Sequence, residues 1–109
     1  MAYNEDLAKR IRTKLKSRSG LTEKRLFGGI GFLVSGNMAC GVHKQDLIIR
    51  LSNNDFDLAI KDPNVRVFDL GGRPMRGWIL VSSGGYSSDE SLQDWIKKGI
   101  AFARSLPAK

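Results

Sequence analysis

The side chains best suited to chemistry in this 109-residue sequence are its single cysteine and its single histidine, Cys40 and His43. The spacing C-x-x-H occurs in zinc sites, but a structural zinc ion needs four ligands and no other cysteine or histidine is present. A Cys-His nucleophilic pair is also conceivable, since a neighbouring histidine can activate a thiol. Alternation along a predicted strand points Cys40 inward, where it packs as a small hydrophobic residue. We therefore expect a protein without a metal site, a cofactor or enzymatic activity, and His43 as a surface residue.

The glycine-rich stretch TEKRLFGGIGF, at residues 22–32, raises the question of a phosphate-binding loop. A dinucleotide fingerprint needs the pattern G-x-G-x-x-G at the start of a helix. Counting from Gly29, Val34 stands where the third glycine belongs, and the residues that follow suit a strand. We interpret Gly28 and Gly29 as a bend or bulge inside one strand, where glycine allows positive φ or close backbone approach.

The stretch RPMRGW, at residues 73–78, is the most suggestive candidate for binding. Two arginines, a methionine and a tryptophan in a predicted turn could bind an anion, a base or a protein. In the alternative interpretation the tryptophan enters the core and both arginines are solvated, because aromatic residues are first of all core material. A small-molecule pocket or small enzyme site in the loop 71–78 is a further, third hypothesis. The candidate partner- or anion-binding residues are Arg73, Met75, Arg76 and Trp78, together with the basic pair Lys24 and Arg25 beside the glycines.

The net charge of +7 is carried by the two ends of the chain, whereas the middle is mildly acidic. Basic ends attract nucleic acid or acidic partners in a salt-dependent way, although the simpler interpretation is a solvated helix face. No exposed aromatic pair interleaves with these charges, and no helix-turn-helix or zinc-finger pattern accompanies them. The candidate nucleic-acid contacts are Lys9, Arg12 and Lys16 near the N-terminus and Lys97, Lys98 and Arg104 near the C-terminus.

These candidates would be positioned by a single α+β domain over residues 1–109. Apolar periodicity and capping residues predict helices at 4–18, 53–61 and 88–106, with Gly99 packed closely against its surroundings. Alternation predicts one strand over 24–27 and 30–35, and further strands at 38–42, 47–51, 65–69 and 78–81, with 70–77 as a turn-rich connection. The order is α-β-β-β-α-β-β-α, an antiparallel sheet of about five strands with the N- and C-terminal helices packed on it.

Composition sets the expected compartment. The 41% hydrophobic and 27% charged content is ordinary for a globular domain. One cysteine excludes an internal disulfide, which makes the reducing cytoplasm the expected compartment. No apolar run approaches the ~18 residues of a membrane span, and the N-terminus lacks the apolar region of a secretory signal. We therefore expect a cytoplasmic protein that does not bind membranes.

The stretch LFGGIGFLVSGNMACGV, at residues 26–42, is similar to the signature of the TfoX N-terminal domain family, roughly M-F-G-G-x-x-F-x-x-x-G-x-M-x-x-G-V. Leu26 stands where methionine is usual. GRPMRGW at 72–78 and FARSLP at 102–107 resemble two further family stretches, so the resemblance covers nearly the whole chain. The matching residues, which we interpret as mainly structural, are Phe27, Gly28, Gly29, Phe32, Gly36, Met38, Gly41 and Val42.

This resemblance implies a βββ-α-ββ core between terminal helices, in agreement with the predicted order. It also implies a cytoplasmic bacterial regulator of competence genes that acts with the transcription machinery, and it supplies no catalytic residues. Longer family members carry a second, helical domain, so we expect a stand-alone N-terminal domain that binds a protein partner. Direct binding of nucleic acid through the basic terminal helices is the alternative, and a homodimer formed through exposed strand edges is a further expectation.

Overall fold

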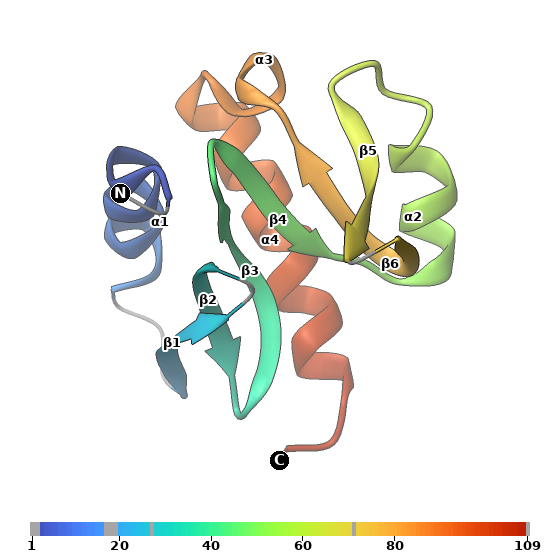
Figure 1. The fold of residues 1–109 in the computed structure, drawn as a ribbon. Helices are drawn as coiled ribbons and strands as arrows, with labels where there is room; N and C mark the ends of the chain where they lie inside the picture. The colour runs from blue at the N-terminus through green and yellow to red at the C-terminus, as the bar shows by residue number, and fades with distance from the viewer. Residues whose placement is uncertain (1–2, 17–19, 27, 71, 109) are drawn as a thin grey trace.

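The computed structural model describes residues 3–16, 20–26, 28–70 and 72–108, and within these ranges it contains six strands and four helices (Figure 1). All six strands join one antiparallel sheet with the order β1-β2-β3-β4-β6-β5. The predicted α+β class and antiparallel sheet between terminal helices are thus confirmed. The elements in chain order are α1 (Glu5–Leu15), β1 (Leu21–Leu26), β2 (Gly29–Val34), β3 (Asn37–His43), β4 (Asp46–Arg50), α2 (Asn53–Ala59), β5 (Val65–Leu70), β6 (Arg73–Val81), α3 (Ser83–Tyr86) and α4 (Asp89–Ser105).

Both terminal helices begin at a capping side chain. The Asn4 side chain accepts a hydrogen bond from the backbone amide of Leu7 at 3.1 Å. The Ser88 hydroxyl accepts one from the amide of Ser91 at 3.0 Å. Acidic residues follow in the first turn of each helix, where the helix dipole favours them. The predicted terminal helices are confirmed, although residues 17 and 18 of the first lie outside the described ranges.

The glycines at positions 28 and 29 belong to a hairpin. Strands β1 and β2 pair with Leu26 opposite Gly29 and Arg25 opposite Ile30. Gly28, which lies between the strands, has a φ of 73°, a left-handed value that glycine adopts without steric cost. The prediction of one bent strand over 24–35 was therefore wrong, because the chain reverses direction there. This reversal gives the sheet six strands, where about five were predicted.

A second hairpin replaces most of the turn-rich connection predicted for residues 70–77. Strand β6 begins at Arg73, and that residue already pairs with Leu70 of β5. Gly72, in the reversal, has a φ of 83°. The prediction was wrong because Leu70 and Arg73 already pair, so the chain reverses in a tight turn rather than in a long loop. The candidate residues from Arg73 to Trp78 therefore lie on a strand.

One face of the sheet, which we call the helix face, is covered by helices. The buried hydrophobic residues of all four described helices belong to a single apolar cluster with strand residues such as Phe32, Val42 and Ile49. Helix α4 lies so close to β3 that a Cβ atom added at Gly99 would stand 2.3 Å from the carbonyl oxygen of Ala39. The predicted close packing at Gly99 is confirmed.

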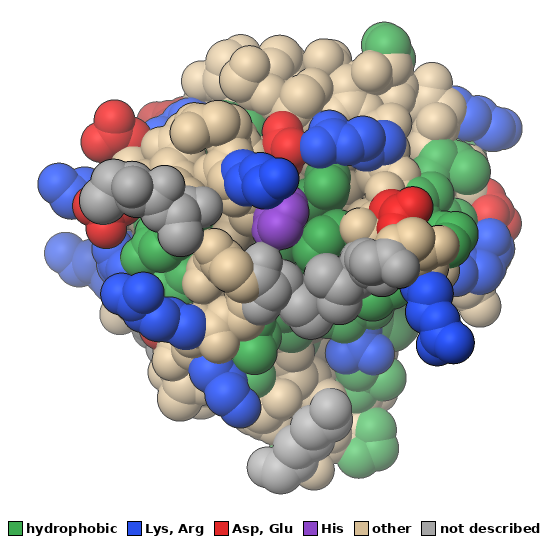
Figure 2. Space-filling model, viewed as in Figure 1, with side chains coloured by type: hydrophobic (Ala, Val, Ile, Leu, Met, Phe, Trp, Pro, Cys, Tyr) green, Lys and Arg blue, Asp and Glu red, His purple; other side chains and the backbone are tan. Residues whose placement is uncertain are grey.

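The opposite face, which we call the open face, carries a separate apolar cluster to which no described helix contributes. Strand side chains themselves cover it: Leu26 and Met38 lie over the positions of Gly31 and Gly41, where a Cβ would meet them at 2.9 and 2.8 Å. Figure 1 looks onto this face with α4 behind the sheet, and Figure 2 shows hydrophobic side chains on one side of the histidine and a basic side chain directly beside it. The cluster consists of buried Met38, Ile48, Phe68 and Leu80 and partly buried Leu26, Leu33, Met75 and Trp78.

Candidate functional site

Cys40 and His43 do not form a catalytic pair. Residues three apart on a strand point to opposite faces, and the two side chains follow that rule. Cys40 is fully buried in the cluster of the helix face, and burial raises the pKa of its thiol to about 12. The His43 ring lies 5.2 Å from the ring of Phe68, on the open face. Within the described ranges, no group of three or more His, Cys, Asp or Glu side chains could hold a metal ion.

The family-motif residues build the first three strands of the sheet. Gly28 and Gly36 have positive φ values of 73° and 85° and lie in the two reversals. In β3, a Cβ added at Gly41 would stand 2.4 Å from the carbonyl oxygen of Ile30, so the two strands require glycine there. The motif is structural in these positions. Gly29, Phe32, Met38 and Val42 are buried strand residues, and Phe27 lies outside the described residues.

The candidate binding residues at 73–78 lie in two different environments. Arg76 holds α2 against β6: its Nη2 lies 2.8 Å from Asp57 Oδ1, its Nε donates to Asn53 Oδ1 at 3.2 Å, and its guanidinium lies over the Phe56 ring. Met75 and Trp78 instead pack against the cluster of the open face. Arg73 is exposed at the start of β6. The stretch therefore does not present both arginines and the tryptophan to one ligand.

A cation that the sequence analysis missed lies beside Trp78. Arg50, the last residue of β4, pairs with Trp78 across the sheet. Its guanidinium carbon lies 5.1 Å from the centroid of the Trp78 ring and 5.3 Å from that of Phe102 on α4. Arg50 is half-buried. Strand alternation could have placed it on the face of Ile48, but the two rings come from distant parts of the chain.

The basic pair on β1 is divided between the two faces. Lys24 lies opposite Gly31 and Arg25 lies opposite Ile30 on the neighbouring strand. Because residues directly opposite in an antiparallel pair share a face, Lys24 stands on the open face and Arg25 on the helix face. Both side chains are exposed. Lys24 thus contributes positive charge beside the apolar cluster of the open face.

Arg12 of α1 and Lys16, which directly follows this helix, border a groove between α1 and β1. The Nε atom of Arg12 lies 3.0 and 2.9 Å from the two carboxylate oxygens of Glu23, and this hydrogen-bonded contact raises the pKa of Arg12. Lys9 and Lys16 are exposed. The groove has a volume of about 440 Å³ and is lined by Arg12, Leu15, Lys16, Leu21, Thr22, Glu23 and Phe32.

The basic residues of α4 face different surroundings. The ammonium group of Lys98 lies 5.1 Å from the Trp95 ring centroid and borders a groove that also contains Asp62, Glu90 and Asp94. Arg104 borders another groove, beside the β2–β3 turn. Lys97 is exposed. The six candidate nucleic-acid contacts therefore do not converge on one described surface.

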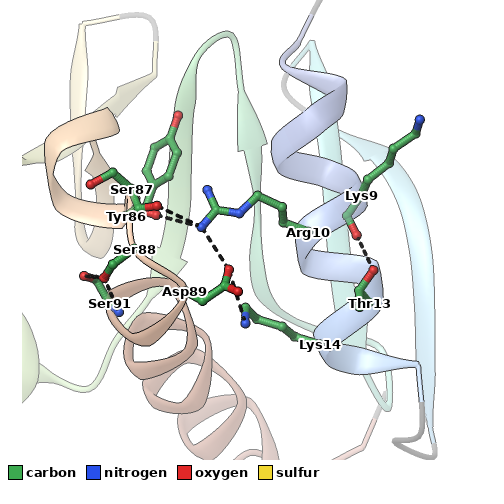
Figure 3. A network of polar contacts seen from close by, with 9 residues as sticks. All are labelled: Lys9, Arg10, Thr13, Lys14, Tyr86, Ser87, Ser88, Asp89 and Ser91. Carbon is green, nitrogen blue, oxygen red and sulfur yellow. Dashed lines mark hydrogen bonds and ion pairs between the residues drawn. The ribbon is translucent and has the colours of Figure 1, made fainter.

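A polar network that no sequence pattern indicated joins α1 to the start of α4 (Figure 3). The Arg10 guanidinium donates to the carbonyl oxygens of Tyr86 and Ser87 at 3.3 and 3.2 Å and to Asp89 Oδ1 at 3.2 Å. The Lys14 ammonium lies 3.7 Å from the same carboxylate oxygen. The Tyr86 hydroxyl donates to the carbonyl oxygen of Gln45 at 2.6 Å, and burial raises the pKa of this phenol. These contacts position helices rather than a ligand.

The comparison with known families gives a match over residues 13–103, to the TfoX N-terminal domain. The match spans all six strands and most of α4. It includes the stretches at 26–42 and 72–78 and the first two residues of FARSLP. No curated protein and no solved structure is similar enough to the chain to count as a match. In the part of the chain that the structure describes, no helix is long and apolar enough to cross a membrane.

Proposed function

The chain belongs to the TfoX N-terminal domain family, and from this premise we propose that it is a non-enzymatic regulatory domain that binds a protein partner through the open face. The regulated process that the family resemblance implies is transcription of competence-type genes, in the bacterial cytoplasm. The observation that carries the proposal is the second apolar cluster, which no described helix covers.

The composition of this face supports a protein partner. Protein interfaces are enriched in methionine, aromatic residues and arginine at their centres. The open face combines Met75, Trp78 and Arg50 around its buried cluster, and Lys24 lies at its margin. A few large side chains of these types supply most of the binding energy in a protein interface, and Met75, Trp78 and Arg50 are the candidates on this face.

The polar groups elsewhere support a role without catalysis. Cys40 is a buried, protonated thiol, which is a poor nucleophile because the thiolate is the reactive form. Several arginines are engaged in contacts that hold elements together, such as Arg76 with Asp57. A small-molecule site in the loop 71–78 would need Arg76 and Trp78 to border one cavity, and they face different surroundings.

Site-directed photo-crosslinking tests the proposal. A photoreactive phenylalanine analogue would replace Lys24, exposed on the open face, and in a matched variant Gln93, exposed on α4. We expect one discrete crosslinked protein from the Lys24 position in the native host and none from Gln93. A crosslink to a second copy of this chain would show the expected homodimer instead. Equal crosslinks from both positions, or none from Lys24, would contradict the proposal.

Direct binding of nucleic acid is the second candidate function, and the exposed lysines of α1 favour it. Lys9 of α1 and Lys16, directly after this helix, are both exposed, in a chain with a net charge of +7. This function predicts retention on DNA with a steep dependence on salt. Combined replacement of Lys9, Arg12 and Lys16 by alanine should abolish that retention, and unchanged binding would count against it.

A further inference from the structure

We propose that Arg50, at the edge of the open face between Trp78 of β6 and Phe102 of α4, is an anion-binding residue, and that its ligand is a carboxylate in an acidic segment of the partner protein. The inference rests on the proposed function for the source of the carboxylate. The site itself, which consists of Arg50, Trp78 and Phe102, is argued from the structure alone.

Residues of three elements, β4, β6 and α4, fix the position of the Arg50 side chain. Arg50 ends β4, and directly after it the amide of Leu51 donates to the carbonyl oxygen of Gly77 at 2.6 Å, which fixes the backbone beside Trp78. The Trp78 ring comes from β6 and the Phe102 ring from α4. An arginine that lies over aromatic rings has fewer conformations to lose when a ligand binds.

The contacts that Arg50 makes with aromatic rings do not use its hydrogen-bond donors, which a ligand could therefore accept from. Aromatic rings attract the positive charge without accepting the five N–H groups of the guanidinium in conventional hydrogen bonds. Among the residues that the structure describes, Arg50 forms no hydrogen bond or ion pair, and its contacts are with the rings of Trp78 and Phe102. The contrast within the chain is clear, since Arg10, Arg12, Arg66 and Arg76 each contact a carboxylate of this protein.

The chemistry of the surroundings favours a carboxylate beside apolar atoms. A guanidinium binds a carboxylate with two parallel hydrogen bonds in its own plane. Trp78 joins this cation to the apolar cluster of the open face. A protein segment with an aspartate or glutamate next to apolar side chains matches both features, whereas a nucleic-acid backbone offers no apolar surface to match the cluster. The net charge of +7 further favours an acidic partner.

A small probe tests the site without the partner. Phenylacetate carries the carboxylate and an apolar ring, and phenylacetamide is its neutral counterpart of the same shape. Binding is followed by NMR at the Nε–H group of Arg50 and the indole N–H of Trp78, with the indole of Trp95 as internal reference. We expect saturable shifts at Arg50 and Trp78 with phenylacetate, and binding about tenfold weaker with phenylacetamide, the factor for one lost charged hydrogen bond.

Two variants and a control separate the role of Arg50 from general effects. Arg50→Gln should remove the response of Trp78 to phenylacetate, and Arg50→Lys, which keeps the charge and the packing of the stem, should weaken it. Arg73→Gln, at the exposed start of β6, should leave it unchanged. Equal responses to phenylacetate and phenylacetamide, or a full response in Arg50→Gln, would overturn the site. A short DNA duplex that shifts Arg50 when phenylacetate does not would overturn the carboxylate assignment.

The crosslinking experiment separates this inference from the proposed function. If the wild-type chain and Arg50→Gln capture the same protein equally well from the Lys24 position, the inference is overturned and the proposed function stands. If phenylacetate binds at Arg50 but nothing crosslinks, the proposed function and the acidic segment as ligand are overturned, and only a carboxylate site remains. Capture that is lost in Arg50→Gln and kept in Arg73→Gln supports both.

Discussion

The two faces of the sheet are built from the same strands and carry different kinds of side chain. The helix face is mostly aliphatic, with Phe32, Phe56 and Tyr86 also buried in it, and Gly99 and Ala39 let α4 approach the strands closely. The open face carries two methionines, a tryptophan and a stacked arginine, and its cover is its own strand side chains. Period-two alternation along the strands thus divides one sheet into a face that packs against the helices and a face that we propose binds a partner.

The largest expected effect is a difference between the two faces in how much one substitution lowers the free energy of unfolding. Leu92→Ala removes a fully buried side chain of α4 and should lower the free energy of unfolding by about 2–5 kcal/mol, because it leaves a cavity. Leu33→Ala, at a partly buried position of the open face, should cost only about 1–2 kcal/mol. Urea denaturation measures both values. A larger loss from Leu33→Ala would break the distinction between the faces.

A smaller loss of stability is expected from a substitution at Gly99, where α4 lies against β3. Gly99→Ala would place a methyl group 2.3 Å from the carbonyl oxygen of Ala39 and should destabilise the protein by about 1–3 kcal/mol. Gln93→Ala, on the exposed side of the same helix, serves as the control and should change little. If Gly99→Ala instead raised the melting temperature, as helix propensity alone predicts, the close contact would be refuted.

The buried thiol of the helix face should make stability depend on alkaline pH. The Cys40 pKa is 9.0 in its ordinary state and about 12 in the fold. Above pH 9 the unfolded chain loses this proton while the folded chain keeps it, so stability should fall by up to about 1.4 kcal/mol per pH unit. Urea denaturation between pH 9 and 11 should show a shallower decline in Cys40→Ala. Identical slopes in the two proteins would show that the thiol is not buried in this way.

The smallest expected effect concerns the polar network in Figure 3. Asp89 is 80% exposed, and surface ion pairs contribute little. Asp89→Asn and Arg10→Met should each cost about 1 kcal/mol or less, and a double-mutant cycle would give their coupling. A coupling larger than the loss from Leu92→Ala would show that polar contacts, rather than apolar packing, hold the helices on the sheet.

The parts of the fold that could be predicted depend on local chemistry. Capping by Asn4 and Ser88 and the apolar stripes behind them define the terminal helices within a few residues of sequence. Strand alternation likewise predicted that Cys40 points inward. The hairpin at Gly28 was missed because the same glycines suit a bend and a reversal, and only pairing between Leu26 and Gly29 distinguishes them.

The candidate site was predicted only in part, because its contacts join distant residues. Met75 and Trp78 were singled out by their types and do lie on the open face. Arg50 was missed because its significance depends on Trp78 and Phe102, which follow it by 28 and 52 positions in the sequence. The sequence does not distinguish Arg76 from Arg73, because the contact of Arg76 with Asp57 exists only once the chain has folded α2 beside β6. Residue type thus indicated the region, and the tertiary arrangement decided which side chains are available.

The central claim is that the open face, and not the helix-covered side, receives the partner, and the two tryptophans of the chain report on it directly. Trp78 lies on the open face, and Trp95 lies on α4, where its indole donates to the carbonyl oxygen of Gly85. The measurement is a titration of the chain with the crosslinked partner, followed by NMR of the two indole N–H signals. We expect the Trp78 signal to move and the Trp95 signal to stay. Movement of Trp95 with an unchanged Trp78 would contradict it.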